Sequence, residues 1–261
     1  MNLLFWNLKK NNSAAYVADL LEEQHTDLAI FSEYSNTDWN YIYKKFPNTY
    51  TLHDGLGGCE KVTLLCKKEI SIVICREHTR YTIYACSYNN EKYLIAGVHL
   101  PSNPHSTDED RKHIIRELIT DLSEQENNYK GYIAIVIGDF NASPFDSELT
   151  QKNMFNAVLY KKLIEKAEYI KYGDHKYRRF YNPMIIVLTE STQTYGSLYY
   201  SSGIASLYWF CYDQILVRKP LVDKIEDLQI RKKIKNKSLL KEVQPDPSIS
   251  DHLPLTVTLK G

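Results

Sequence analysis

The stretch IAIVIGDFNASP, residues 133–144, is the part of the chain that decides its fold class. Four of its first five residues are β-branched, which favours a strand buried on both faces over Ile133–Ile137. Asp139 and Asn141 follow as soon as this apolar run ends. Layered α/β proteins keep their active sites at such strand ends, so the stretch predicts both an α/β fold and a site.

The same change from apolar to polar recurs along the chain. In the N-terminal half, polar residues follow three more apolar runs: Asn7 after Leu3–Trp6, Glu33 after Leu28–Phe31 and His99 after Leu94–Val98. Near the C-terminus the order reverses, with Asp213 before Gln214–Val217, and Asp251 and His252 before Leu253–Leu259. If these later strands run antiparallel to the earlier ones, all of these side chains converge on one rim.

The residue types at this rim suit one kind of chemistry. Carboxylates helped by an asparagine carbonyl form a hard-oxygen site for Mg²⁺, for which Mn²⁺ can substitute. Two histidines without a cysteine partner argue against structural zinc. A histidine beside carboxylates can protonate a phosphate oxygen, and an aspartate can polarise an attacking water. Together they indicate metal-dependent phosphodiester hydrolysis.

The remaining elements are predicted from periodicity and turn residues. Helices are expected from about Ala14 to Gln24 with Ser13 as its cap, over Asp108–Glu126, and over part of Asn156–Tyr169. Further strands are expected at Val62–Cys66, Ile70–Cys75, Tyr81–Ser87, Tyr93–His99 and Trp209–Val217, with a hairpin turn at Asn89–Asn90.

Length and charge set bounds on the class of protein. The chain has 261 residues, of which 43% are apolar and 25% charged, so we expect one globular domain over residues 1–261. Lysine plus arginine equal aspartate plus glutamate at 32 each. The chain therefore lacks the strong basic excess of many nucleic-acid binders, although a metal ion and a local basic patch can supply positive charge.

The cysteines indicate a reducing compartment. They are odd in number and form no CxxC pair: Cys59, Cys66, Cys75, Cys86 and Cys211. The start, MNLLFWNLKK, lacks the charged lead and long apolar stretch of a signal peptide. No run approaches the roughly eighteen apolar residues that span a bilayer. We expect a cytoplasmic protein with no membrane partner and no obligate protein partner.

Six segments together carry a resemblance to a known family: LFWNL, FSEY, GVHLPS, GDFNASP, YDQILV and SDHLPL. Their order and separations resemble the endonuclease–exonuclease–phosphatase superfamily, which includes exonuclease III and deoxyribonucleases. The specific signature is GDFN followed much later by SDH before an apolar strand. The segments span residues 4–255, nearly the whole chain. The resemblance implies a four-layer α-β-β-α sandwich, with two packed mixed β-sheets and helices on the outer faces.

The resemblance also implies a metal side of the site. Glu33 matches the principal metal-ligating glutamate of the family. Asn7 matches a residue that supports the metal or the substrate, and Asp251 matches an additional metal-side acid. We expect Mg²⁺ at these three residues.

On the catalytic side, Asp139 matches the residue that orients or deprotonates the nucleophilic water, and Asn141 matches its phosphate-binding neighbour. His252 matches the histidine at the scissile phosphate, with Asp213 as its partner carboxylate. His99 matches the histidine of the deoxyribonuclease, sphingomyelinase and deadenylase branches. Abasic-site endonucleases carry a tyrosine-based arrangement there, which counts against a role in abasic-site repair.

Each motif has a structural alternative when taken alone. Asn7 and Glu33 could be strand-end turn residues, Asp139–Asn141 an ordinary Asx turn, and His99 a satisfied core histidine. The joint order of all the motifs favours the functional interpretation.

Outside the motifs, aromatic and basic residues are candidates for substrate contacts. Trp209 and Tyr195 are expected to line the cleft, where a base or sugar could stack, with ordinary strand packing as the alternative. Two basic stretches could contact phosphates or be solvated surface: Lys176 with Arg178 and Arg179, and the lysine-rich run Arg231–Glu242.

The predicted function is metal-dependent hydrolysis of phosphodiester bonds, in a nuclease that acts on DNA or RNA. Fold and site do not determine substrate, so a phosphatase or phosphodiesterase acting on a phosphoinositide, sphingomyelin or a small nucleotide is the alternative. Neither a dedicated basic pocket for inositol lipids nor an apolar membrane-facing hairpin is evident. A catalytically silent binding module is the alternative of another class.

Overall fold

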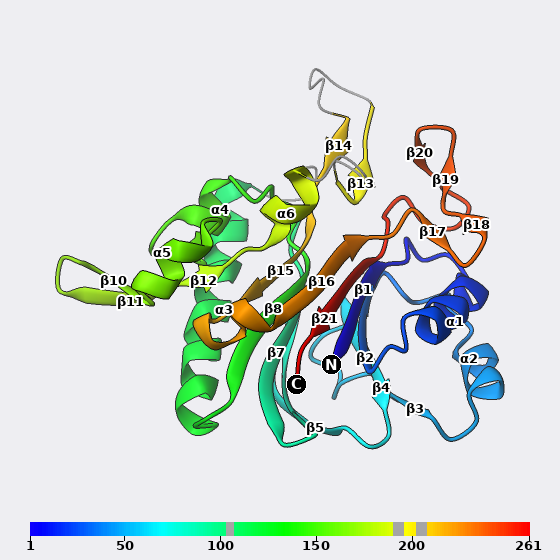
Figure 1. The fold of residues 1–261 in the computed structure, drawn as a ribbon, viewed down its shortest axis with the longest axis horizontal. Helices are drawn as coiled ribbons and strands as arrows, with labels where there is room; N and C mark the ends of the chain where they lie inside the picture. The colour runs from blue at the N-terminus through cyan, green and yellow to red at the C-terminus, as the bar shows by residue number, and fades with distance from the viewer. Residues whose placement is uncertain (103–106, 190–195, 202–207) are drawn as a thin grey trace.

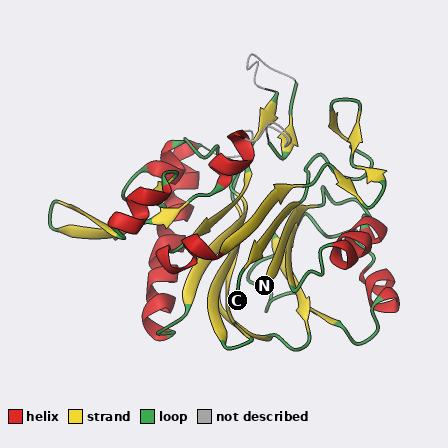
Figure 2. Cartoon of the chain, in the orientation of Figure 1, coloured by secondary structure: helices red, strands yellow, loops and turns green. Residues whose placement is uncertain are grey.

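Two β-sheets pack face to face at the centre of the molecule, and helices cover their outer faces (Figures 1 and 2). The structure is a computed structural model that describes residues 1–102, 107–189, 196–201 and 208–261. Both termini lie close to the sheet interface (Figure 1). This is the predicted α/β sandwich with two mixed sheets.

The first sheet has six strands in the order β16-β21-β1-β2-β4-β3. Only β1 and β2 pair in parallel within it, and the other neighbours are antiparallel. The strands are β1 (Asn2–Asn7), β2 (Leu28–Ser32), β3 (Tyr50–His53), β4 (Val62–Lys67), β16 (Ile225–Ile230) and β21 (Leu255–Leu259).

The second sheet has seven strands in the order β5-β6-β7-β8-β15-β12-β9. Parallel pairing joins β7 to β8 and β12 to β9. The strands are β5 (Ser71–His78), β6 (Tyr81–Tyr88), β7 (Glu91–His99), β8 (Ile133–Asp139), β9 (Ala157–Val158), β12 (Phe180–Tyr181) and β15 (Asp213–Val217). The predicted turn between β6 and β7 is confirmed, since Asn89 and Asn90 both have positive φ, at 50° and 64°.

Alternation along β8 divides the core in two. Ile135 and Ile137 point into the larger cluster between the two sheets, whereas Ala134 and Val136 point into a second cluster beneath the longest helix. Both faces of the strand are therefore buried, which is why its sequence is apolar throughout. That residues 1–261 form one domain stays a prediction.

Six α-helices lie in the described ranges, mostly outside the sheets. α3 packs on the outer face of the second sheet through Ile115, Leu118 and Leu122. Its predicted extent is confirmed, and Thr107 closes a capping box with Asp110. The helices are α1 (Ala14–Glu23), α2 (Trp39–Lys45), α3 (Asp108–Asn128), α4 (Ser147–Thr150), α5 (Lys161–Lys166) and α6 (Met184–Thr189), with a 3₁₀ helix at Lys219–Lys224. No described helix is long and apolar enough to cross a membrane.

Two local predictions are wrong. Ser13 precedes α1, but its hydroxyl donates to the carbonyl oxygen of Ile249 at 2.7 Å and does not cap the helix. The expected strand Trp209–Val217 is two strands, because Trp209–Phe210 (β14) leaves the main sheet and pairs with Leu198–Tyr199 (β13). In the first case a partner distant in the sequence overrides the local pattern, and in the second a separate two-stranded hairpin does.

The remaining strands form small hairpins outside the main sheets. They are β10 (Tyr169–Tyr172) with β11 (His175–Arg178), β17 (Lys233–Ile234) with β18 (Lys237–Ser238), and β19 (Leu240–Lys241) with β20 (Gln244–Pro245). The β10–β11 hairpin extends beyond the helices on one side of the molecule (Figure 1).

Candidate active site

The sheet topology brings the polar strand ends to one rim. Because β7 and β8 are parallel, His99 and Asp139 end neighbouring strands opposite each other. β15 runs antiparallel to β8, so its first residue, Asp213, lies opposite Asp139 on the other side. The segment before β21 carries His252 to the same rim from the other sheet. The convergence expected from the sequence therefore requires both sheets.

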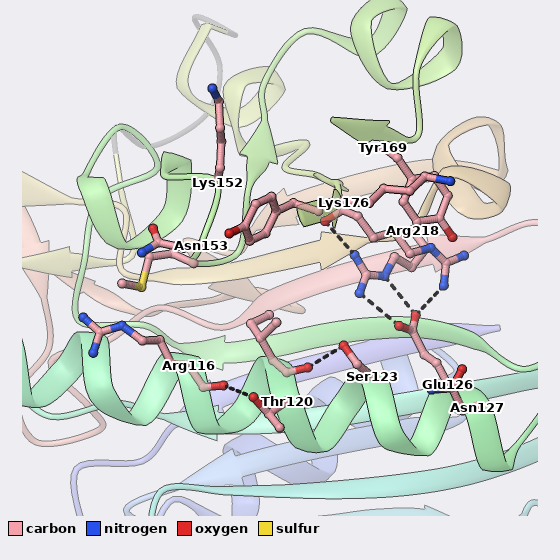
Figure 3. A pocket seen from close by; sticks show the side chains of 14 residues that line it. Arg116, Thr120, Ser123, Glu126, Asn127, Lys152, Asn153, Tyr169, Lys176 and Arg218 are labelled. Atoms are coloured by element: carbon pink, nitrogen blue, oxygen red, sulfur yellow. Dashed lines mark hydrogen bonds and ion pairs between the residues drawn. The ribbon is translucent and has the colours of Figure 1, made fainter. Parts of the chain in front are cut away.

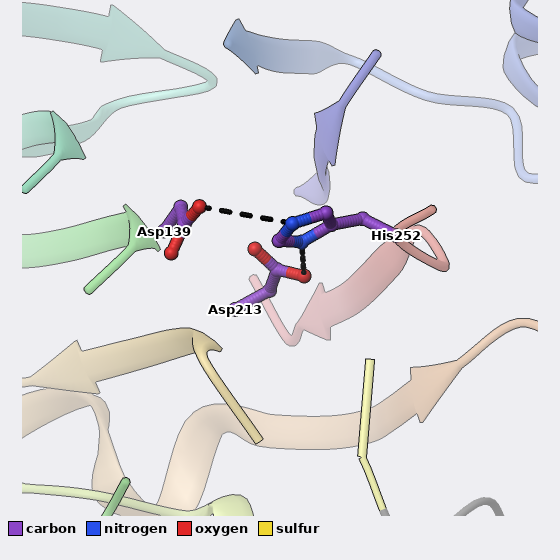
Figure 4. A group of neighbouring side chains, drawn as sticks. All are labelled: Asp139, Asp213 and His252. Carbon is purple, nitrogen blue, oxygen red and sulfur yellow. Dashed lines mark hydrogen bonds and ion pairs between the residues drawn. The ribbon is translucent and has the colours of Figure 1, made fainter. Parts of the chain in front are cut away.

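His252 and Asp213 form a buried pair. Nδ1 of His252 lies 2.8 Å from Oδ2 of Asp213, and the residues are 7% and 0% exposed (Figure 4). Burial opposes protonation of His252, but Asp213, and more weakly Asp139, raise the pKa of the imidazole to about 10. Burial also raises the pKa of Asp213, against the attraction of His252. The pair holds its proton at neutral pH, and Nε2 of His252 faces into the site.

Asp139 lies at the centre of the rim and is 1% exposed. Its Oδ1 accepts a hydrogen bond from the backbone amide of Asn141 at 2.9 Å. Its Oδ2 lies 3.2 Å from Nδ2 of Asn7, 3.7 Å from Nε2 of His99 and 4.0 Å from Nε2 of His252. One carboxylate oxygen is thus held by the backbone, while the other is presented to three side chains.

Glu33 occupies the more open side of the rim. Its Oε1 lies 3.4 Å from Nδ2 of Asn7 and 3.7 Å from Nε2 of His99, and its side chain is 31% exposed. The residue has a φ of 50°, which turns the chain sharply after β2. Burial lowers the pKa of His99, although Asp139 and Glu33 oppose the shift. Asn7 holds both carboxylates through its amide nitrogen, while its side-chain oxygen accepts from the Lys9 amide at 3.0 Å.

The backbone after β8 is shaped by a glycine and an asparagine. Gly138 has a φ of 156°, and a Cβ there would lie 2.0 Å from the carbonyl oxygen of Val98. Only glycine lets β8 approach β7 this closely. Asn141 has a φ of 47°, and its Nδ2 donates to the carbonyl oxygen of Leu100 at 2.8 Å. These contacts fix the loop that carries Asp139 and Asn141.

Arg111 supports the same loop from α3, although it was not among the site residues predicted from the sequence. Its Nη1 donates to the carbonyl oxygen of Asn141 at 2.7 Å, and its Nε donates to Oε1 of Glu148 at 3.2 Å. Arg111 and Glu148 are both buried, at 3% and 5% exposed. No local pattern marks Arg111, because it precedes the apolar stripe of a long helix like any surface arginine.

Ser250 positions His252 and had a signal in the sequence, since it begins the SDHLPL segment. Its hydroxyl donates to the carbonyl oxygen of Asn7 at 2.6 Å and accepts from the backbone amide of His252 at 3.0 Å. Nε1 of Trp6 donates to the carbonyl oxygen of His252 at 2.9 Å. The segment before β21 is therefore tied to the end of β1.

Of the predicted site residues, Asp251 and Trp209 lie apart from this group, and Tyr195 lies outside the residues that the structure describes. Oδ2 of Asp251 pairs with Nζ of Lys9 at 3.2 Å, and both side chains are more than a third exposed. Trp209 packs edge-on against Tyr199 with ring centroids 5.4 Å apart, in the hairpin whose Leu198 bridges to His252.

The rim fits a divalent cation. Ligand atoms of Asp139, Asp213 and His252 all lie within 4.8 Å of one another, as Figure 4 shows for the three side chains. Oδ1 of Asp213 is buried and has no hydrogen-bond partner among the described residues. With Glu33 added, three carboxylates surround the site, and such hard-oxygen ligands suit Mg²⁺ or Mn²⁺.

A cavity of about 690 Å³ opens beside Glu33 and His99. Its wall includes three basic side chains that sequence reasoning did not single out: Lys10, Lys61 and Arg80. Lysine and arginine beside a carboxylate site can hold a polyanion whose phosphate lies at the metal.

Comparisons with known proteins agree with this fold. Residues 4–252 match the sequence pattern described as the Endonuclease/Exonuclease/phosphatase family. The chain therefore belongs to the endonuclease/exonuclease/phosphatase family and has the fold of its hydrolases. A comparison with curated proteins finds no match.

Solved structures with the same fold are distant in sequence. Truncated Caenorhabditis elegans TDP2 matches with a TM-score of 0.63 and 15% identity, covering 100% of this chain and 97% of that one. D. rerio TDP2 complexed with single-strand DNA product matches with a TM-score of 0.58 and 14% identity, covering 100% and 99%. The endonuclease domain of TRAS1, a telomere-specific non-LTR retrotransposon, matches with a TM-score of 0.56 and 12% identity, covering 99% and 97%.

Proposed function

We propose that this protein is a Mg²⁺-dependent phosphodiesterase that hydrolyses nucleic acid, with Mn²⁺ able to replace Mg²⁺. The strongest support is the setting of Asp139. Its carboxylate is oriented by the Asn141 amide and faces His99 and His252 within 4.0 Å. A base held by the backbone between two imidazoles is suited to in-line attack by water on phosphorus.

Each residue has a distinct part in the proposed reaction. Asp139 aligns the water and accepts its proton. His252, held by Asp213, donates from Nε2 to the charge that develops on the phosphate. His99 and Asn141 hold the non-bridging oxygens. These groups are pre-positioned before substrate arrives, which is the condition for electrostatic stabilisation of a transition state.

The bound cation would be held by Glu33, with Asn7 beside it, whereas Asp251 would have to leave its ion pair with Lys9 to take part. When bound, it neutralises charge on the phosphate and on the leaving oxygen. Glu33 suits this role because its carboxylate is the more open one and has an oxygen 3.7 Å from the same imidazole nitrogen as Asp139. Asn7 keeps the two carboxylates in place through its amide.

Nucleic acid is the proposed substrate on two grounds. The cavity beside Glu33 carries Lys10, Lys61 and Arg80, which can neutralise successive phosphates. Structures of the same fold include D. rerio TDP2 complexed with single-strand DNA product and the endonuclease domain of TRAS1. Trp209 and Tyr195 stay proposed substrate contacts, and a cytoplasmic location stays a proposal.

The test is hydrolysis of labelled single- and double-stranded DNA, RNA and bis-p-nitrophenyl phosphate, with Mg²⁺, Mn²⁺ or EDTA. Asp139→Ala is compared with Asp223→Ala, which removes an exposed aspartate of the 3₁₀ helix. We expect polynucleotide cleavage that needs metal and falls ~10²-fold or more in Asp139→Ala only.

The other outcomes separate the alternatives. Cleavage of the small diester alone would place the substrate among phosphoinositides, sphingomyelin or small nucleotides. Full activity in Asp139→Ala would refute the proposed role of that residue. Absence of turnover with either metal would favour a catalytically silent binding module.

A further inference from the structure

A second groove lies away from the rim, between α3 and the β10–β11 hairpin (Figure 3). Its volume is about 510 Å³. One wall is the outer face of α3, where residues spaced three or four apart line up: Arg116, Thr120, Ser123 and Asn127. The other wall comes from the hairpin and from Lys152 and Asn153 after α4.

The floor of the groove is a buried ion-pair network. Oε1 of Glu126 on α3 lies 2.8 Å from Nη1 of Arg178 and 2.9 Å from Nε of Arg218 (Figure 3). The guanidinium of Arg218 is buried and lies 3.7 Å from the centroid of the Phe180 ring. Arg178 also pairs with Glu168 at 2.7 Å. Two arginines and two glutamates balance, so the floor is neutral and holds the hairpin base against the helix.

The positive charge of the groove is at its upper edge. Nζ of Lys176 lies 4.1 Å from the ring centroid of Tyr169, and Nζ of Lys152 lies 4.4 Å from that of Tyr172. Both lysines are exposed. Among the described residues neither has a carboxylate within ion-pair distance, unlike Lys45 of α2 and Lys235 and Lys237 of the β17–β18 hairpin, which all pair with Asp19.

Two exposed tyrosines accompany these lysines. Tyr169 is 40% exposed and Tyr172 is 63% exposed, both on β10. Aromatic faces beside lysines without carboxylate partners are the combination that binds single-stranded nucleic acid, since bases stack on rings and phosphates meet ammonium groups.

We propose that the groove between α3 and the β10–β11 hairpin binds single-stranded nucleic acid, as an exosite for the substrate. This rests on the proposed function. Lys152 and Lys176 contact phosphates, Tyr172 stacks on a base, and the polar face of α3 lines the path between them.

The position of the groove fits a strand that also reaches the catalytic rim. Arg111 contacts the Asn141 loop, and Ser123 lies twelve residues further along α3, or about 18 Å at the helical rise of ~1.5 Å per residue. A stacked strand rises ~3.4 Å per nucleotide, so about five nucleotides span this distance. Oligonucleotides shorter than that should gain nothing from the groove.

The test compares Lys152→Ala/Lys176→Ala with a control pair, Lys44→Ala/Lys68→Ala, which removes two exposed lysines near α2. Binding of a fluorescent 20-nucleotide single strand is followed by anisotropy in EDTA, which prevents cleavage, at several salt concentrations. For single strands each phosphate contact contributes about 0.7 to the magnitude of the slope of log K against log salt. We therefore expect this magnitude to fall by about 1.4 in the groove pair only.

Turnover separates this proposal from the catalytic one. The groove pair should hydrolyse bis-p-nitrophenyl phosphate like wild type and show a raised KM for the 20-nucleotide strand. Another outcome is that wild type shows no cleavage while the groove pair still loses affinity for the strand. That result refutes the proposed function but leaves the groove as a nucleic-acid binding site. Equal affinity and equal salt slope in the groove pair and the control pair would overturn the exosite. It would also be overturned if the groove pair lost as much affinity for poly-glutamate, a polyanion without bases, as for the nucleic-acid strand.

The aromatic contribution is tested with Tyr172→Leu. Loss of a base stack should weaken binding of the 20-nucleotide strand about fivefold or more. Binding of an abasic strand of the same length should be unchanged. Equal weakening for both strands would show that Tyr172 only supports Lys152, which contradicts the stacking role.

Discussion

Two polar clusters of this molecule join residues more than 200 positions apart, and they differ in how their charges are balanced. The α1 ion-pair cluster consists of Asp19, Glu22, Lys45, Lys235 and Lys237. In it, lysines surround Asp19 at 2.8 to 3.1 Å, and most of the side chains are well exposed. Three lysines face two carboxylates, and because the excess charge is exposed to solvent the cluster needs no further ligand.

The catalytic rim is unbalanced by comparison. Three carboxylates, Glu33, Asp139 and Asp213, face one protonated imidazole, that of His252, so two negative charges are left in a largely buried place. Buried charge of one sign is costly unless something neutralises it. The difference teaches that imbalance together with burial, more than the number of charged residues, marks a ligand site.

The same comparison explains the lysine-rich run Arg231–Glu242. In the sequence it was a candidate for nucleic-acid contacts or a solvated face. Lys235 and Lys237 instead pair with the acidic face of α1. Lys176, from the other basic stretch, and Lys152, which stands in neither stretch, keep their charge available in the groove between α3 and the β10–β11 hairpin.

The largest expected effect comes from breaking the buried pair that supports the rim. Arg111→Ala leaves Glu148 buried without its partner, which should cost about 3–5 kcal/mol of unfolding free energy. Arg116→Ala, on the same helix but exposed, should cost ~0.5 kcal/mol or less. Urea denaturation measures both, and similar losses would show that the buried pair is not special.

Removing the imidazole that faces Asp139 comes next. His252→Ala should lower kcat/KM on the polynucleotide ~10²-fold or more, because the charge on the phosphate loses its donor. Lys237→Ala in the α1 ion-pair cluster should leave kcat/KM unchanged. Near wild-type turnover by His252→Ala would remove the rim from the mechanism.

A smaller effect is expected from neutralising the carboxylate behind that imidazole. Asp213→Asn keeps the shape but no longer favours the protonated ring, so turnover should fall about tenfold and the change should be in kcat more than KM. The pKa of His252, followed by NMR, should fall as well. An unchanged imidazole pKa would show that Asp213 does not act through His252.

The smallest effect is on pH-dependent stability. Asp19 is partly buried, which favours its neutral form, but hydrogen bonds from Lys45, Lys237 and Lys235 hold its pKa well below 3.8. Because the folded pKa is depressed, the stabilisation is complete above pH ~3.8 and is lost as the pH falls below it. Asp19→Asn should cost ~1 kcal/mol or less at pH 7 and less still at pH 3, measured by urea denaturation. An equal cost at both pH values would contradict this origin.

Local sequence patterns predicted the structure correctly where the interacting residues are neighbours in the chain. Asn89–Asn90 form the predicted hairpin turn because their left-handed conformation is a property of those two residues and of the strands beside them. Ser13 was misjudged because its hydroxyl donates to Ile249, a partner 236 residues away that no local window of the sequence contains. Trp209 was misjudged because it pairs with Tyr199 in a separate hairpin, and an apolar run does not reveal which sheet a strand joins.

The sequence by itself determined the strands that carry the polar rim, the long helix and the order of the polar strand ends, because burial imposes apolar runs and a polar residue where each run leaves the core. Only the tertiary structure decided which charges meet. Parallel pairing of β7 with β8 and antiparallel pairing of β15 place Asp139 between His99 and Asp213. The buried Arg111 and the groove at α3 depend on elements packed across the fold. Electrostatic partners are therefore a property of distances in space, which chain order does not specify.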